Sequence, residues 1–144
     1  MKMKTENVNN PDFQASELYQ NFLENNKGSG GLLIRAYAAN EAIPIEGMKI
    51  IVSTIFNDVK IIFFEGVTDN SGMIKRLQLP APATDPNDLN VPKKTVYQIE
   101  VPYILNNTNM EYSVNIYDGV CVIQNINPIP NVGPRFGMRK RYGS

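Results

Sequence analysis

Short apolar runs, separated by turn-forming residues, fill the stretch from Gly31 to Pro80. In the first run Leu32, Ile34 and Ala36 occupy every second position, so they share one face of an extended strand. The residues between the runs are mostly Pro, Asn, Asp and Gly, which favour turns. The pattern therefore predicts the core of an all-β domain with antiparallel strands.

The same pattern continues through the C-terminal half and predicts seven strands in total. They are Leu32–Ala39, a strand that begins at Ile43 with Met48, Ile50 and Val52 pointing inward, Val59–Val67, Met73–Leu79, Thr95–Val101, Tyr112–Tyr117 and Val120–Ile126. Seven short strands at this spacing favour a seven-stranded antiparallel sandwich of two sheets. The sandwich is expected to span residues 31–130.

Polar turn signals define how these strands connect. We predict tight turns at Asn57-Asp58, at Thr68–Gly72 and at Asp118-Gly119, the last as a hairpin between the final two strands. The proline-rich stretch from Pro80 to Pro92 is too long for a hairpin, so we expect it to cross from one sheet to the other.

The first 30 residues predict an N-terminal helical arm. Residues 1–10 are polar and expected to be flexible, and a helix is expected from Pro11, capped by Asn10. The segment Lys27–Gly31 has little side-chain bulk and predicts a hinge. The helix carries an apolar stripe that either packs on its own sandwich or docks on a neighbouring subunit: Phe13, Leu18, Phe22 and Leu23.

Residues 131–144 predict a basic C-terminal tail. The last ten residues contain four cations, no acid and two aromatic residues, and the candidate contact residues are Arg135, Phe136, Arg139, Lys140 and Arg141. Such a tail either contacts nucleic acid or an acidic protein surface, or is solvated and disordered. The whole chain has 14 basic and 14 acidic residues, which argues against general binding of nucleic acid or anionic lipid.

The residue types present exclude several kinds of chemistry. There is no histidine, so Ser–His and Cys–His nucleophiles and a His-based zinc site are excluded. Cys121 is the one cysteine, and its position between two valines of a predicted strand favours a core or near-surface residue over a nucleophile. We therefore expect a protein that is not an enzyme and that carries no cofactor and no metal.

The acidic residues do not form a convincing site in the sequence. Asp69 is a potential calcium ligand, but a turn in which its carboxylate accepts backbone N–H groups is the favoured interpretation. Asp85 and Asp88 lie in the proline-rich loop, with no regular strand or helix to hold them at the separation that a glycosidase requires. The N-terminus has no apolar segment typical of a secretory signal, so we expect cytoplasmic synthesis.

Several short motifs follow one another in order along the predicted sandwich. They are Gly31-x-Leu33-Ile34, Pro44-Ile45-x-Gly47-Met48-x-Ile50, Thr68-Asp69-x-x-Gly72 and Tyr97-x-Ile99-x-Val101, with Pro130 at the end. In these motifs the chain resembles a carboxypeptidase-regulatory-like, transthyretin-like domain of the prealbumin and Cna-B type, as found in clostridial proteins. The resemblance implies a transthyretin-like or immunoglobulin-like sandwich with an accessory role. Relatives of the Cna-B type often carry a lysine–asparagine crosslink, which is not expected here because the first strand offers Arg35 and no lysine.

Two hypotheses about function follow. The first is a structural protein, a subunit or decoration of a bacterial or phage assembly such as a virion, an injection apparatus, a fibre or an appendage, joined through its terminal arms. The abundance of Asn and Ile and the absence of Trp are typical of such sources. The alternative is an accessory module that binds peptidoglycan or spore-cortex glycan through exposed tyrosines, for which the candidates are Tyr37, Tyr97, Tyr103 and Tyr117.

Overall fold

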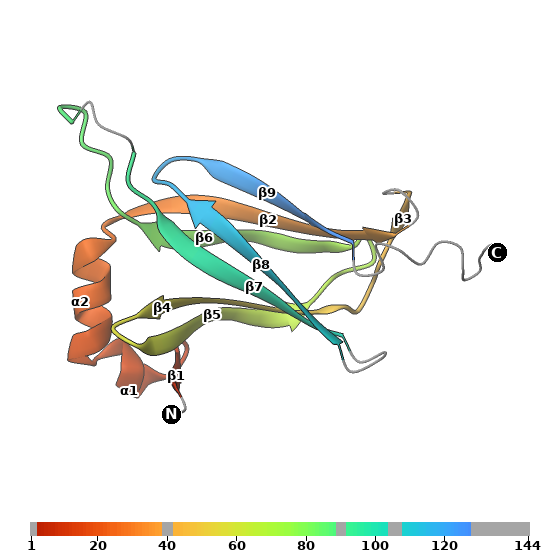
Figure 1. Ribbon diagram of the computed structural model, residues 1–144, viewed down its shortest axis with the longest axis horizontal. Coiled ribbons are helices and arrows are strands. Elements are labelled where there is room, and N and C mark those ends of the chain that lie inside the picture. The colour runs from red at the N-terminus through yellow and green to blue at the C-terminus, as the bar shows by residue number, and fades with distance from the viewer. Residues whose placement is uncertain (1–2, 39–41, 89–91, 104–107, 128–144) are drawn as a thin grey trace.

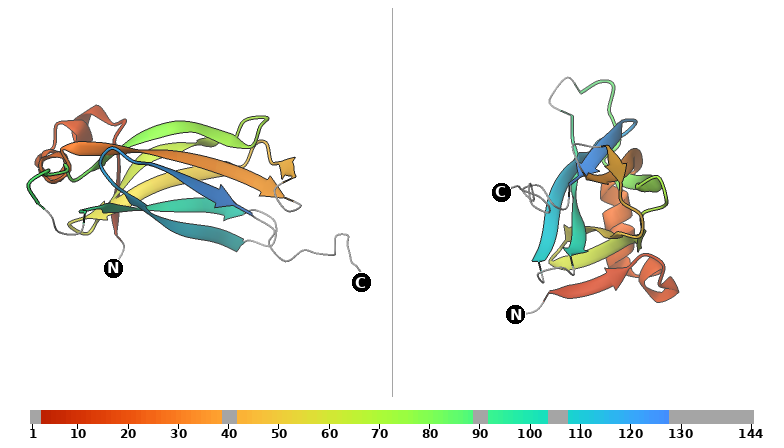
Figure 2. Two further views of the ribbon diagram at one scale, coloured as in Figure 1. Left: turned by 90° about the horizontal axis from the view of Figure 1, so that it is seen from above. Right: turned by 90° about the vertical axis from the view of Figure 1, so that its right-hand side faces the viewer.

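The computed structural model describes residues 3–38, 42–88, 92–103 and 108–127 of the chain. Two β-sheets face each other across a hydrophobic core, and two short helices lie at one end (Figure 1). The end-on view in Figure 2 shows the two layers and α2 between their ends. The prediction of a β-rich, sandwich-like domain with an N-terminal helical segment is therefore confirmed.

The first sheet contains five strands and the second is built around β2. In the order of their pairing, the first sheet consists of β1 (Lys4–Asn7), β5 (Val59–Val67), β4 (Lys49–Phe56), β7 (Thr95–Tyr103) and β8 (Thr108–Ile116). The second sheet consists of β3 (Ile43–Pro44), β2 (Gly28–Ala38) and β6 (Met73–Ala81), with β9 (Cys121–Ile126) also paired to β2. The proline-rich segment after β6 leads into β7 of the other sheet, so its expected crossing between sheets is confirmed.

The prediction of seven strands that are all antiparallel is wrong. The described residues contain nine strands, and two pairs are parallel, β1 with β5 and β2 with β9. The strand β1 was not expected because its four residues are polar, as suits the edge of a sheet. Both parallel pairs therefore join strands that the hydrophobic pattern alone does not bring together.

The turn at Asp118-Gly119 does not close a hairpin. It carries the chain from β8 in the first sheet to β9 in the second. The N–H of Gly119 donates to the carbonyl of Ser29 (2.8 Å), and the N–H of Gly31 donates to the carbonyl of Val120 (2.9 Å). These bonds attach the turn to β2, and β9 then continues along β2 in the same direction.

The two sheets bury a continuous core between their inner faces. Its fully enclosed side chains alternate along the strands as expected, and include Leu32, Ile34, Ile50, Val52, Tyr97, Ile99 and Val101. Tyr97 is completely buried, and its hydroxyl donates to the carbonyl of Pro80 (2.6 Å). Burial raises the pKa of the Tyr97 phenol far above its ordinary value, so the residue stays neutral and donates this bond at all ordinary pH values.

The N-terminal helical segment consists of two helices, α1 (Pro11–Gln14) and α2 (Glu17–Asn25). The predicted cap is confirmed, because Asn10 Oδ1 accepts the N–H of Asp12 (3.0 Å). A second cap was not expected, at Ser16, where the side-chain oxygen accepts the N–H of Tyr19 (3.2 Å). This second cap marks the start of α2, so the single predicted helix is divided in two.

The glycine-rich segment before the first long strand is not a hinge. Gly28 to Gly31 are part of β2, and their register pairs them with residues 78–81 of β6. Next to them, the hydroxyl of Thr95 donates to Asn26 Oδ1 and fixes the end of α2 against β7. The glycines therefore allow close approach of neighbouring segments rather than motion.

Candidate functional site

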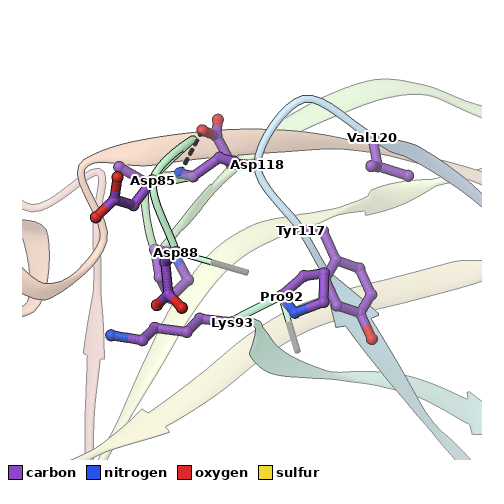
Figure 3. A pocket seen from close by; sticks show the side chains of 10 residues that line it. Asp85, Asp88, Pro92, Lys93, Tyr117, Asp118 and Val120 are labelled. Carbon is purple, nitrogen blue, oxygen red and sulfur yellow. Dashed lines mark hydrogen bonds between the residues drawn. The ribbon is translucent and has the colours of Figure 1, made fainter. Parts of the chain in front are cut away.

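A pocket of about 470 Å³ opens at the end of the sandwich where β9 begins. We call it the end pocket. Two segments that are distant in the sequence form it, the loop that follows β6 and the turn between β8 and β9 (Figure 3). Its described lining residues are Pro82, Ala83, Thr84, Asp85, Asp88, Pro92, Lys93, Tyr117, Asp118 and Val120.

Asp118 holds the two walls of the end pocket together. Its Oδ1 accepts the N–H of Ser29 in β2 (3.1 Å), and its Oδ2 accepts the N–H of Thr84 in the loop (2.9 Å). One carboxylate thus joins three segments of the chain. The pair Asp118-Gly119 was expected to make a turn, and the structure adds this tethering role.

The acid side of the pH–stability profile tests this tether. The N–H groups of Thr84 and Ser29 hold the pKa of the Asp118 carboxyl below its ordinary value of 3.8. Because the folded-state pKa is lowered, the stabilisation is present above pH 3.8 and disappears as the pH falls through the folded-state value. We therefore expect unfolding of Asp118→Asn, followed by urea titration between pH 2 and about 6, to depend less on pH than unfolding of the wild type. Glu46→Gln is the control, and an Asp118→Asn profile with the wild-type slope would contradict the tether.

Charged and apolar side chains occupy different sides of the end pocket. Figure 3 shows Asp85, Asp88 and Lys93 on one side and Pro92 and Tyr117 on the other. The loop backbone is shaped locally, because Asp85 Oδ1 accepts the N–H of Asn87 (2.9 Å). The pocket can therefore accept a ligand that is cationic at one end and flat or apolar at the other.

The open edge of β9 is a second candidate surface. The N–H of Gly31 donates to the carbonyl of Val120, so the even-numbered residues of β9 direct their backbone groups toward β2. The backbone groups of Cys121, Ile123 and Asn125 therefore face the opposite side. In the described part of the chain no strand pairs with that side.

This edge lacks the features that usually prevent edge strands from pairing. The other edge strands carry charged residues or proline: Lys4 and Glu6 in β1, Pro44 in β3, Lys75, Arg76 and Pro80 in β6, and Glu111 in β8. Strand β9, CVIQNI, has neither. Ile123 is 55% exposed on it, and Val120 just before it is 46% exposed. An uncharged edge with exposed apolar side chains is suited to pairing with another strand.

The four predicted contact residues of the helical segment lie against the chain's own sandwich. Phe13 and Phe22 are buried together with Ile61 of β5, and Leu18 and Leu23 pack partly buried against them. Of the two alternatives, packing on its own domain is the one that the structure shows. A contact with another subunit through this stripe stays a prediction, and it would require these side chains to leave their core.

The other candidates fall into different places. Arg135, Phe136, Arg139, Lys140 and Arg141 lie outside the described residues, as does the side chain of Tyr103. Tyr97 is enclosed in the core and cannot stack on a sugar, whereas Tyr37 is partly exposed and lies under the guanidinium of Arg35, 4.9 Å from the ring centre. Tyr117 lines the end pocket. Cys121 is exposed at the start of β9.

The acidic residues considered in the sequence have mixed outcomes. Asp69 makes the favoured turn, because its Oδ1 accepts the N–H groups of Ser71 (2.8 Å) and Met73 (3.0 Å). Asp85 and Asp88, for which the sequence offered no common framework, lie on one pocket with Lys93. Among the described residues, no group of three acidic, histidine or cysteine side chains is arranged to hold a metal ion.

Comparison with models of known protein families gives no match, and comparison with curated proteins gives no significant relative. The resemblance to the transthyretin-like domain therefore stays a prediction. Across the described residues, no helix has the length and apolarity that crossing a membrane requires. The functional conclusion accordingly depends on the end pocket and the β9 edge.

Proposed function

We propose that this chain is a non-enzymatic structural protein, a subunit or decoration of a larger bacterial or phage assembly such as a virion, an injection apparatus, a fibre or an appendage. The observation that carries the proposal is the β9 edge, which exposes backbone donors and acceptors beside Ile123 and has no charge or proline to repel a partner. A strand from another subunit gains hydrogen bonds and buries apolar surface by pairing there. A transthyretin-like sandwich of the family suggested by the sequence motifs would suit this role.

The connectors in this proposal differ from those first expected. The helical segment has its apolar stripe committed to its own core, with Phe13 4% and Phe22 1% exposed. Removing both rings from that core to reach a neighbour would cost several kcal/mol, roughly 2 kcal/mol or more for each ring. Pairing at the β9 edge does not carry this cost, so we assign a subunit contact to that edge.

Two isoleucines with the same exposure provide a matched test. Ile123 on the β9 edge is 55% exposed, and Ile55 on the central strand β4 is 54% exposed. A lysine at Ile123 places a charge at the proposed contact, so we expect Ile123→Lys to weaken self-association about tenfold or more. Ile55→Lys removes the same apolar surface from a strand that is paired on both sides, so it should associate like the wild type.

Sedimentation velocity over a range of protein concentrations measures the association. Assembly that responds equally to both lysine substitutions would remove the β9 edge from the contact. A wild-type protein that stays monomeric at every concentration, alone and with its purified partners, would overturn the proposed function.

A second candidate function has one observation in its favour. Tyr117 lies on a pocket that also carries Asp85 and Asp88, and an aromatic ring beside carboxylates is typical of sites that bind sugars. The module would then bind peptidoglycan or spore-cortex glycan. For this candidate function, we expect the wild-type protein to be retained on purified peptidoglycan. The Tyr117→Ala variant should lose this retention, and the Tyr37→Ala variant should keep it.

A further inference from the structure

The end pocket carries an excess of negative charge. Three carboxylates, those of Asp85, Asp88 and Asp118, and one ammonium, that of Lys93, line its described part. Asp118 is held by two backbone N–H groups and stays ionised above its lowered pKa. Charges of one sign that gather around a pocket attract a segment of the opposite sign.

The rest of the lining is apolar and includes an aromatic ring. Pro82, Ala83, Pro92 and Val120 contribute apolar surface, and Tyr117 contributes its ring. Guanidinium groups stack on such rings and also bind carboxylates with two parallel hydrogen bonds. A ligand that joins arginines to aromatic residues therefore matches both sides of the pocket.

The chain itself contains a segment of this chemistry. Residues 135–144 carry four cations, no acid, and the aromatic residues Phe136 and Tyr142. Seven residues separate Asn127, the last described residue, from Arg135, which is enough for a reach of roughly 25 Å. The segment thus has both the charge and the length to reach a pocket outside its immediate surroundings.

The positions of the end pocket and of Asn127 favour a pocket on another copy. Strand β9 begins beside the pocket at Val120 and runs away from it, so its six residues place Asn127 about 20 Å farther along the sandwich. Figure 1 shows β9 ending at the side of the molecule opposite α2. From Asn127 the chain must turn back along the sandwich to reach its own pocket, whereas the pocket of another copy can lie next to that end.

We propose that the basic segment 135–144 of one copy binds in the end pocket of the next copy, so that subunits join head to tail. Arginine and lysine side chains pair with Asp85 and Asp88, and an aromatic side chain packs on Tyr117 and Pro92. This inference rests on the proposed function and names a partner for it. Because the two contact surfaces differ, the contact is heterologous, and its repetition joins subunits into a ring or an open filament.

Neutralising each surface separately tests the proposal. The pocket variant is Asp85→Asn with Asp88→Asn, and the segment variant is Arg135→Gln with Arg139→Gln, Lys140→Gln and Arg141→Gln. Each variant, studied as the full chain by sedimentation velocity, is expected to associate at least about tenfold more weakly than the wild type. Wild-type association is also expected to weaken as salt is raised from 0.05 to about 0.5 M. The control, Glu17→Gln with Glu46→Gln, removes two exposed acids that lie on no edge strand and should associate like the wild type.

Mixing the two variants distinguishes contact between copies from contact within one. The pocket variant keeps an intact basic segment, and the segment variant keeps an intact pocket. With Ile123→Lys added to both variants to block the β9 edge, a mixture is therefore expected to form dimers of one copy of each and nothing larger. Variants that associate as strongly as the wild type would overturn the inference. So would a wild-type protein that stays monomeric and whose compactness, rather than its association, depends on salt.

The same measurements separate this inference from the proposed function. Assembly that Ile123→Lys weakens and the pocket variant leaves unchanged would overturn the pocket contact and support the role of the β9 edge. Binding of peptidoglycan at Tyr117, with association unchanged in the pocket variant, would assign the end pocket to the glycan instead. Thermal unfolding of each variant confirms that the fold is intact, and the segment variant changes only residues beyond the described fold.

Discussion

Replacing Phe22 by alanine is expected to lower the free energy of unfolding by about 3–5 kcal/mol. Phe22 is 1% exposed, and its ring lies 5.4 Å from that of Phe56 and 5.6 Å from that of Phe63, measured between ring centres. Alanine removes these contacts and leaves a cavity between α2 and the end of the first sheet. Urea unfolding at neutral pH, followed by circular dichroism, measures the loss.

The size of this effect decides what the helical segment does. If α2 were an arm that swings away to dock on a neighbour, truncating Phe22 would change the stability of the monomer by no more than a surface substitution, about 0.5 kcal/mol. Leu18→Ala is the internal comparison, because Leu18 belongs to the same stripe but is only partly buried, and its loss should be clearly smaller. Similar small losses for both variants would support the detachable arm.

The sequence predicted those features that depend on a few adjacent residues. Asn57 and Asp58 both have positive φ angles, 49° and 63°, as a two-residue hairpin turn requires, and β4 and β5 pair across them. The cap at Asn10 was likewise readable, because Asn followed by Pro favours a helix start. Such signals depend on the conformation of two to four residues, and no distant segment overrides them here.

Pairing between distant strands was not predictable in the same way. Strand β9 shows the expected alternation, but alternation sets only which face a residue occupies and not which strand lies beside it. Its parallel partner β2 is selected by bonds from the Asp118-Gly119 turn to Ser29, 89 residues earlier in the chain. A two-residue polar turn ordinarily indicates a hairpin, so the sequence pattern predicted the wrong neighbour.

The end pocket was hidden for a related reason. Asp85, Asp88 and Tyr117 come from two segments that meet only after both sheets have formed. In the sequence, Asp85 and Asp88 lie in a proline-rich loop, and no predicted strand or helix fixes their positions relative to Tyr117. The β9 edge, by contrast, is partly predictable. The sequence shows that this strand has no charge and no proline, and these are the residues that usually prevent an edge strand from pairing.

Replacing Gly30 by alanine is expected to destabilise the fold by about 3 kcal/mol, whereas alanine at Gly31 should change the stability by less than about 1 kcal/mol. A Cβ atom at Gly30 would fall on the backbone carbonyl oxygen of Tyr117 and 2.9 Å from Ile116 Cγ2. The carbonyl oxygen cannot move away without separating the β8–β9 turn from β2.

At Gly31 the new atom would instead meet the guanidinium end of Arg76, at 2.5 Å from Nε, and this flexible side chain can swing aside. Alanine there also restricts the unfolded chain, which offsets part of any cost. The two substitutions thus distinguish a hinge from a close approach of two backbones. In a hinge, alanine at either position would lower the stability by a similar, small amount. Equal urea midpoints for the two variants would mean that the turn does not lie against β2, and would remove the wall on which the end pocket depends.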